Sequence, residues 1–232
     1  MKIMLVDDDL GIRSVIEDIV VQEGYEFHYV SHSLDALDAI KAERPDLLIL
    51  DVMMPGLNGF DLCRRIRDDG RNIPIIFLSA KGDIVDKSIG FKAGGDDYVV
   101  KPFSSEELLL RIDAHIRRHK NDIAFNKESQ LKGSSTTGDL EIFHDRYEIR
   151  KAGAPLNLSS KEFEIVSFMA SEPGKVFTRE QILEHIWGDS TLGDLNSVTV
   201  FIRRIREKIE DNPSQPKYLL TVWRVGYKFS EG

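Results

Sequence analysis

Cysteine and long apolar runs are both scarce in this chain of 232 residues. Cys63 is the only cysteine, so no internal disulfide can form, and we expect a reducing, cytoplasmic setting. No run approaches the roughly 18 apolar residues that a membrane-spanning helix needs, so we expect no contact with a membrane. Residues 1–4 lead straight into a predicted strand, without the layout of a signal peptide. Internal repeats are also lacking, which excludes a solenoid.

An excess of positive charge is lacking as well, because the formal net charge is −8 at pH 7. Taken over the whole chain, this balance argues against binding to nucleic acid. The charge is unevenly distributed, however. Residues 1–119 hold 22 acidic and 15 basic residues, whereas residues 196–230 hold 3 acidic and 7 basic residues. The last stretch is therefore locally basic, and a DNA-binding patch there is compatible with the acidic total.

The first 119 residues alternate short apolar runs with longer amphipathic segments. We expect strands near 2–6, 26–30, 46–50, 74–78 and 97–100, and helices at 10–23, 33–43, 58–69, 83–92 and 104–119. Five strand–helix units in a row predict an α/β domain with a doubly wound, parallel, five-stranded sheet.

A second domain follows a polar stretch. Residues 120–137 lose the apolar periodicity, so we expect a linker there, and the second domain at 138–232. Strand-like runs are expected at 140–143, 147–150 and 156–158, and a hairpin at 218–229. Three helices are expected between them, the third at 196–210. The first two begin with the capping boxes Ser159/Glu162 and Thr178/Gln181. This order predicts an α+β domain.

Polar side chains end four of the predicted strands: Asp7 and Asp8, then Asp51, Ser79 and Lys101. The carboxyl ends of parallel strands meet at one edge of a sheet, so these groups are expected to lie together. Neighbouring carboxylates repel one another, and Mg2+ with its preference for oxygen ligands removes that cost. One carboxylate can then attack phosphorus, while the lysine and the hydroxyl stabilise phosphoryl oxygens.

Two other interpretations of these acids stay open. Each aspartate alone is more commonly a helix cap or a solvated loop residue, and Asp9, which precedes a predicted helix, fits a cap better than a ligand. A Mg2+-dependent phosphatase or hydrolase with Asp51 as nucleophile would use the same acids. That alternative leaves residues 138–232 without a role.

The first half resembles the receiver domain of two-component response regulators, which has a flavodoxin-like fold. The resemblance is carried by the acids above together with three motifs: Asp51-Val-Met-Met-Pro-Gly-Leu-Asn-Gly59, Gly95-Asp96-Asp97-Tyr98 and Lys101-Pro102-Phe103. It implies that Asp51 accepts a phosphoryl group from a sensor histidine kinase. It also implies that Mg2+ is held by Asp7, Asp8, Asp51 and the Met53 backbone carbonyl. Further, it implies a switch that couples Ser79 to Tyr98, and a cis bond before Pro102.

Six charged residues match positions that pair across the active dimer of OmpR/PhoB regulators. The resemblance implies the intersubunit pairs Lys87 with Glu107, Asp97 with Arg111, and Asp96 with Arg118. A charge-rich face is more often only solvated, and a single exposed pair contributes about 0–1 kcal/mol. A fit of all six residues to one pattern favours a homodimer when the protein is phosphorylated.

The predicted helix 196–210 has an apolar stripe and an opposite polar face. Asn196, Thr199, Val200 and Arg203 on the polar face suit base edges in a major groove, and Arg204 and Arg206 suit phosphates. An ordinary surface helix would show a similar pattern, so the helix alone does not decide.

The surrounding motifs resemble the winged helix-turn-helix effector domain of OmpR/PhoB regulators. They are Leu158-Ser-Ser-Lys-Glu-Phe-Glu-Ile165, Gly174-Lys-Val-Phe-Thr-Arg-Glu-Gln-Ile182, Trp187 and Val225-Gly-Tyr-Lys-Phe229. The resemblance implies that helix 196–210 enters the major groove and that the hairpin wing reaches the minor groove. Arg224 stands one position later than the arginine usual in that wing, which leaves its role open. Trp223 either packs within the wing or contacts the DNA backbone.

Together these features predict a DNA-binding transcription regulator rather than an enzyme. The expected sequence of events is phosphorylation of Asp51, rearrangement of Ser79 and Tyr98, dimerisation through the receiver, and binding to direct-repeat promoter sites on double-stranded DNA. A DNA-binding protein whose receiver is never phosphorylated is the remaining alternative.

Overall fold

The computed structural model describes residues 1–80, 84–125, 134–188 and 195–231. The chain divides into two compact units, Met1–Arg117 and Arg118–Gly232, each of which is described by itself below. Among the described residues, no helix combines the length and the apolar character that crossing a bilayer requires.

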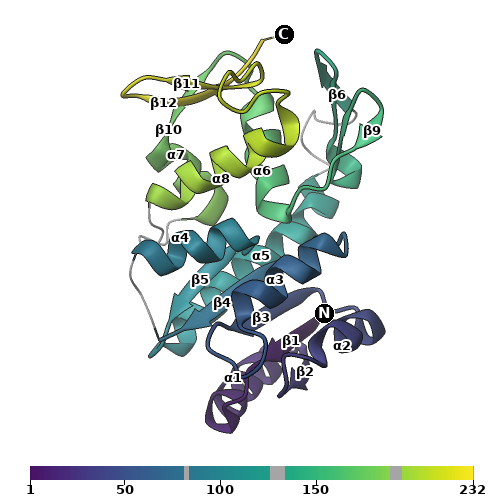
Figure 1. Cartoon of the computed structure of the whole chain (residues 1–232), viewed down its shortest axis with the longest axis vertical. Helices are drawn as coiled ribbons and strands as arrows, with labels where there is room; N and C mark the ends of the chain where they lie inside the picture. The colour runs from purple at the N-terminus through teal and green to yellow at the C-terminus, as the bar shows by residue number, and fades with distance from the viewer. Residues whose placement is uncertain (81–83, 126–133, 189–194, 232) are drawn as a thin grey trace. The chain divides into compact units, whose positions relative to one another are not determined.

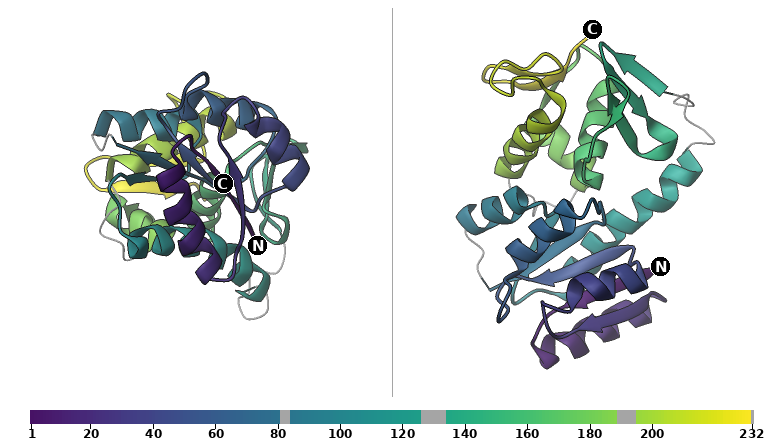
Figure 2. Two further views of the ribbon diagram at one scale, coloured as in Figure 1. Left: turned by 90° about the horizontal axis from the view of Figure 1, so that it is seen from below. Right: turned by 45° about the vertical axis from the view of Figure 1, so that its right-hand side comes forward.

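The first unit is built on a five-stranded parallel sheet in the order β2-β1-β3-β4-β5 (Figure 1). The strands are β1 Lys2–Val6, β2 Glu26–Val30, β3 Leu47–Asp51, β4 Ile75–Ser79 and β5 Asp97–Val100. Strands β3 and β4 are buried along their whole length, because helices cover both faces of the sheet (Figure 2). The predicted doubly wound α/β sheet is confirmed.

The helices of this unit begin and end close to the predicted positions. They are α1 Leu10–Gln22, α2 Ala36–Glu43, α3 Gly59–Asp68, α4 Ile84–Ala93 and α5 Ser105–Phe125. Apolar residues of α1 and α5 pack together on one face of the sheet. Helix α2 begins three residues later than predicted, because the Ser33 hydroxyl bonds to the Pro55 carbonyl and the Leu57 amide and keeps that segment in a loop.

The second unit places three helices between two antiparallel sheets. The helices are α6 Ser160–Ala170, α7 Arg179–Trp187 and α8 Leu195–Ile209. One sheet has the order β6-β7-β8-β9, and the other has the order β10-β12-β11. The strands are β6 Ser134–Thr137, β7 Leu140–Phe143, β8 Glu148–Lys151, β9 Ala154–Pro155, β10 Val176–Thr178, β11 Leu219–Val222 and β12 Gly226–Phe229. Both predicted capping boxes are present at the starts of α6 and α7.

Three sequence predictions need correction. Helix α5 continues to Phe125 and β6 occupies 134–137, so ordered elements enter the predicted linker 120–137 from both sides. The helix continues because residues 105–125 contain no glycine or proline, and polar β6 is held by its pairing with β7. The predicted strand 156–158 is absent, since the Leu158 amide bonds to the Leu156 carbonyl and turns the chain. The remaining predicted linker residues, 126–133, lie outside the described part.

Candidate functional site

The predicted acid site forms at the carboxyl edge of the parallel sheet. Asp7 and Asp51 are 1% and 4% exposed, and Asp8 beside them faces solvent. Each of the three offers a carboxylate oxygen, and these oxygens lie within 4.8 Å of one another. The neighbouring Asp9 instead caps α1, accepting bonds from the Gly11 and Ile12 amides. The structure thus separates the cap from the cluster as the sequence predicted.

Lys101 bridges the two buried carboxylates. Its ammonium donates to Asp51 Oδ1 at 2.6 Å and to Asp7 Oδ2 at 2.9 Å. The other oxygen of Asp51 accepts a bond from the Met53 amide at 2.7 Å. Burial raises the pKa of Asp7 despite the lysine. Burial alone would lower the pKa of Lys101, but its bonds to Asp51 and Asp7 outweigh this and raise it.

The charge balance of the cluster fits a divalent cation. When ionised, Asp7, Asp8 and Asp51 carry three negative charges, and Lys101 offsets one of them. Two negative charges remain at an oxygen-lined site that is partly open to solvent, which matches the charge and the ligand preference of Mg2+.

Ser79 and Tyr98 lie on the two strands next to this cluster. Ser79 is buried at the end of β4, and its carbonyl accepts a bond from the Lys101 amide at 2.7 Å. The Tyr98 side chain is 4% exposed, and its ring centroid is 6.3 Å from that of Phe77. The predicted cis bond between Lys101 and Pro102 is present.

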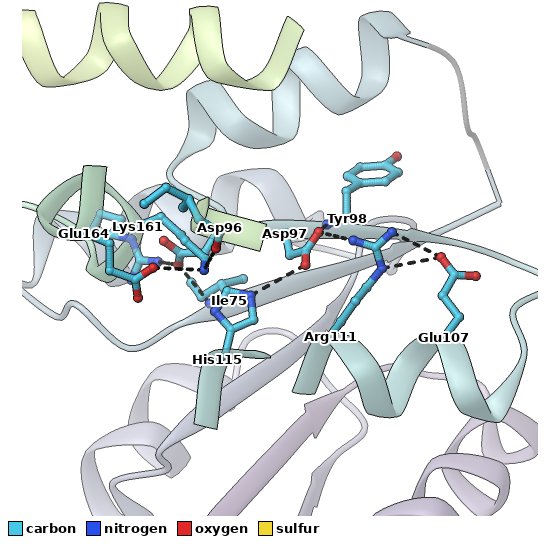
Figure 3. A network of polar contacts seen from close by, with 11 residues as sticks. Ile75, Asp96, Asp97, Tyr98, Glu107, Arg111, His115, Lys161 and Glu164 are labelled. Atoms are coloured by element: carbon cyan, nitrogen blue, oxygen red, sulfur yellow. Dashed lines mark hydrogen bonds and ion pairs between the residues drawn. The ribbon is translucent and has the colours of Figure 1, made fainter. Parts of the chain in front are cut away.

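Three of the predicted dimer residues, Asp97, Glu107 and Arg111, contact one another within the receiver (Figure 3). Arg111 donates to Asp97 at 2.5 Å and contacts Glu107 at 3.2 Å, and His115 Nε2 lies 3.6 Å from Asp97. Burial would raise the pKa of Asp97, but the charge of Arg111, together with the neighbouring His115 and Tyr98 amide, outweighs it and lowers that pKa.

The other three predicted dimer residues are placed differently. Asp96 is fully buried, where it accepts bonds from Arg67 at 2.7 Å and from the Ile75 amide at 3.0 Å. Lys87 lies half-buried on α4, and Arg118 lies on α5 with its side chain outside the described part. Sequence analysis missed Arg67, because 29 residues separate it from Asp96 and no local pattern links the two.

Helix α8 exposes only some of its predicted DNA contacts. Asn196, Thr199 and Arg203 face solvent, and Val200 is half-buried. Arg203 also pairs with Glu207 one turn along the helix, at 2.9 Å. These side chains form the outer face of α8, opposite the buried apolar stripe.

Arg204 and Arg206, predicted to contact phosphates, have partners inside the domain. Arg204 is 8% exposed and lies 2.7 Å from the Glu162 carboxylate. Arg206 donates from Nε and Nη2 to the Leu219 carbonyl at 2.8 and 2.6 Å, and from Nη2 to the Thr221 hydroxyl. The guanidinium of Arg206 therefore ties α8 to the first strand of the wing.

Glu162 has a second role that its capping motif does not indicate. Its carboxylate bonds to the Ser159 amide at 2.7 Å, as a capping box requires. The same carboxylate lies 2.7 Å from Arg204 and 2.6 Å from Lys208 of α8. Because Glu162 is fully buried, it fixes α8 against α6 through two ion pairs.

The wing is a hairpin with a three-residue turn. Val222 pairs with Gly226, and the Val225 amide bonds to the Val222 carbonyl at 3.0 Å. Arg224 at the centre of the turn has a φ of 62°, in the left-handed region. Its side chain is exposed, as is that of Trp223. The turn therefore projects both side chains away from the core.

Comparison with known proteins identifies the families of the two halves of the chain. Residues 3–113 match the family model described as "Response regulator receiver domain", and residues 153–229 match "Transcriptional regulatory protein, C terminal". The chain is similar to response regulator DrrB, an OmpR/PhoB homolog of Thermotoga maritima, at 35% identity over 99% of this chain and 98% of that one, with a TM-score of 0.49.

Two further solved structures are similar. A putative response regulator from Chloroflexus aurantiacus is 38% identical, covering 50% of this chain and 98% of its own, with a TM-score of 0.48. A mutant of RitR is 24% identical over 100% of this chain and 99% of its own, and its TM-score of 0.81 supports the fold. The family models and the identity to DrrB over almost the full length establish that the chain belongs to the OmpR/PhoB family of two-component response regulators, with a receiver domain and a DNA-binding effector domain.

Proposed function

We propose that Asp51 is the phosphoacceptor of a transcription regulator that is switched on by a sensor histidine kinase. The observation that carries this proposal is the position of the Asp51 carboxylate, buried beside the Lys101 ammonium at 2.6 Å. One carboxylate oxygen attacks the phosphorus of the phosphohistidine, and the bond from phosphorus to the histidine nitrogen breaks as the new phosphorus–oxygen bond forms. Lys101 stabilises the negative charge of the phosphoryl oxygens.

Mg2+ is the cofactor that the cluster fits. The carboxylates of Asp7, Asp8 and Asp51 and the backbone carbonyl of Met53 would hold it, with Asp7 acting partly through water. When bound, Mg2+ supplies positive charge to the phosphoryl oxygens. Among the residues that the structure describes, Lys101 is the cation bonded to these carboxylates, and one positive charge leaves two negative charges, so phosphoryl transfer should depend on the metal.

The switch begins with the hydroxyl of Ser79. It moves toward the phosphoryl group, and Tyr98 turns into the space that becomes available. The tyrosine packs beside α4, since a methyl group on Gly90 would lie 3.3 Å from its ring. A rotation of the Tyr98 side chain would therefore alter the packing of the face formed by α4, β5 and α5. That face then forms the homodimer through Lys87, Asp97, Glu107, Arg111 and Arg118, whereas Asp96, the sixth residue implied by the resemblance, is fully buried and held by Arg67.

The dimer places two effector domains on direct-repeat half-sites of promoter DNA. The exposed face of α8, with Asn196, Thr199, Val200 and Arg203, reads the major groove. Arg224 contacts phosphate from the wing. Arg204 and Arg206 support this surface through their bonds inside the domain, to Glu162 and to Leu219.

The test is the intact mass of the full chain after treatment with acetyl phosphate and Mg2+, followed by sizing and a gel shift with promoter DNA. We expect one phosphoryl adduct and a shift to dimer for the wild type, and neither for Asp51→Asn. Asp38→Asn, at an exposed position on α2, is the matched control and should behave as wild type. An adduct on the Asp51→Asn protein, or DNA binding that ignores phosphorylation, contradicts the proposal. Steady turnover of a phosphate ester would instead indicate a hydrolase.

A further inference from the structure

The tip of the wing exposes two large apolar side chains, two positions apart in the turn. Trp223 is 80% exposed, the highest value among the large apolar side chains that the structure describes, and Val225 is 52% exposed. Apolar surface of this size at the tip of a hairpin is unfavourable in water and commonly marks a binding surface. The other tryptophan, Trp187, is only 7% exposed and packs on Phe201.

The base of the wing is tied to α8, and the turn at its tip has a defined conformation. The hydrogen bond that closes the turn and the left-handed conformation of Arg224 define the turn. At the base of the wing, Arg206 bonds to Leu219 and Thr221, and the Tyr227 hydroxyl lies 3.5 Å from the Thr199 hydroxyl. The wing that carries Trp223 and Val225 is therefore anchored to α8, the helix whose outer face is expected to meet the ligand.

The charge at the tip itself is positive. Arg224 stands at the centre of the turn, between the two apolar residues, while Lys228 lies on β12 opposite Leu220 and Lys217, beyond the other end of β11, pairs with Asp211 at 3.2 Å. The outer face of α8 adds Arg203. Apolar side chains among basic ones suit the minor groove of DNA, where phosphates lie on both sides of a narrow and weakly polar floor.

We propose that Trp223 and Val225 form an apolar wedge that enters the minor groove and selects A·T over G·C at that position. This inference rests on the proposed function, because it requires the domain to bind duplex DNA. A G·C pair presents the guanine N2 amine in the minor groove, and the wedge offers this donor no acceptor. Covering the amine with apolar surface leaves it without a hydrogen bond, whereas an A·T pair has no such donor.

The first experiment measures whether the wedge is buried by DNA. The probe is a duplex selected from a random pool by the phosphorylated full-length chain, and the readout is acrylamide quenching of tryptophan fluorescence. The difference between wild type and Trp223→Phe isolates the signal of Trp223 from that of buried Trp187. We expect the duplex to lower the quenching of Trp223 several-fold and to leave that of Trp187 nearly unchanged.

The second experiment tests selection in the groove. Each A·T pair flanking the selected site is replaced in turn by G·C and by inosine·cytosine, which lacks the N2 amine. At the wedge position we expect G·C to weaken binding about 5- to 50-fold, within the usual cost of one mismatched pair. A duplex with inosine·cytosine at that position should bind as tightly as the duplex with A·T. Trp223→Ala and Val225→Thr should each reduce this discrimination, and both exposed sites should tolerate the change without loss of thermal stability.

The outcomes separate the wedge from DNA binding itself. If the wild type selects no duplex from the pool, the proposed DNA-binding function fails. If it binds tightly while Trp223 stays accessible to acrylamide, the wedge is wrong, and the tip is left for a protein partner. Equal affinity for A·T, G·C and inosine·cytosine at every flanking position also overturns the wedge. The wedge is also wrong if the Trp223→Ala protein still prefers A·T over G·C as strongly as the wild type does.

Discussion

Asp97 and Arg111 form a buried ion pair within one receiver, with the guanidinium 2.5 Å from the carboxylate and Glu107 on its other side (Figure 3). The same two residues are expected to pair between subunits in the active dimer. Dimerisation would then exchange one Asp97–Arg111 pair for another, with little net change in the number of ion pairs. Such an exchange sets the register of the interface more than its affinity.

Mixing two charge variants tests this exchange. Asp97→Arg and Arg111→Asp each place like charges at both contacts of a symmetric homodimer, so each phosphorylated variant alone should stay monomeric. In a mixed dimer both contacts would again join opposite charges. We therefore expect an equimolar mixture to recover dimer on a sizing column with light scattering, to more than half of the wild-type amount.

The two variants also break the pair inside each chain, and mixing cannot repair that. Thermal unfolding of each variant before mixing shows whether the receiver is still folded. If the receivers are folded and the mixture stays monomeric, the pair is only intramolecular. The double variant Asp97→Arg/Arg111→Asp should dimerise by itself under either interpretation, so it serves as the control for tolerance of the swapped charges.

The lowered pKa of Asp97 predicts an acid-dependent loss of stability. The folded-state pKa lies below the ordinary value of 3.8, so the ionised carboxylate stabilises the fold fully above that value and progressively less as the pH falls through the folded-state pKa. Asp97→Asn should cost about 3 kcal/mol near pH 7, since it leaves Arg111 buried with Glu107 alone. Urea unfolding from about pH 7 down to about pH 3 should show this difference shrinking below about pH 4. A difference that stays constant or grows in acid contradicts the assignment.

The strands, the helices and the acid site follow from local patterns. Buried parallel strands leave continuous apolar runs, and their carboxyl ends meet at one edge whatever the helices between them contain. This is why Asp7, Asp51 and Lys101, far apart in sequence, could be grouped before any contact was known. The capping boxes at Ser159 and Thr178 are equally local, and both were found.

Contacts between distant side chains left no comparable signal. Arg67 with Asp96, and Glu162 with Arg204, depend on how helices pack, and neither spacing is periodic. An exposed arginine and a buried one look alike on a helical wheel, so Arg206 was assigned to phosphates although it bonds to Leu219. Strand β6 was missed for a different reason, because a polar strand that is held by pairing resembles a linker in sequence.

Gly95 should be intolerant of alanine because of Phe77. A methyl group on Gly95 would lie 2.2 Å from Cε2 of the Phe77 ring, far inside contact distance. We expect Gly95→Ala to destabilise the receiver by about 1–3 kcal/mol, the usual cost of overpacking. Phe77→Leu shortens the blocking side chain, so the double variant should lose clearly less stability than the sum of the two single variants, measured by urea unfolding.

Gly70→Ala is the matched control for that pair. Gly70 has a φ of 76° with nothing within 4 Å of an added methyl group, so its cost is conformational and not steric. Phe77→Leu should therefore not reduce the cost of Gly70→Ala. If the effects of Gly95→Ala and Phe77→Leu are strictly additive, the backbone at Gly95, just before β5, moves away from the Phe77 ring and makes room for the methyl group.

Removal of Arg206 should lower both stability and DNA affinity, whereas removal of Arg203 should lower DNA affinity alone. Arg206→Ala deletes the bonds to the Leu219 carbonyl and to Thr221, so we expect a loss of about 1–3 kcal/mol in stability and weaker DNA binding through a loosened wing. Because its guanidinium is engaged inside the domain, the dependence of affinity on salt should hardly change. Arg203→Ala, at an exposed site, should leave stability within about 0.5 kcal/mol and weaken DNA binding through the lost contact.

The salt dependence of DNA affinity shows whether Arg206 holds the wing in place or binds a DNA phosphate. The Arg224→Ala variant gives the change in slope expected when one phosphate contact is lost. Arg224 is exposed at the turn of the wing, so its removal should lower the slope of log K against log salt by about one and leave thermal stability unchanged. If Arg206→Ala lowers that slope by the same amount and unfolds at the wild-type temperature, then Arg206 leaves Leu219 and binds a phosphate in the complex. An unchanged slope with a lower unfolding temperature shows instead that Arg206 acts by holding the wing against α8.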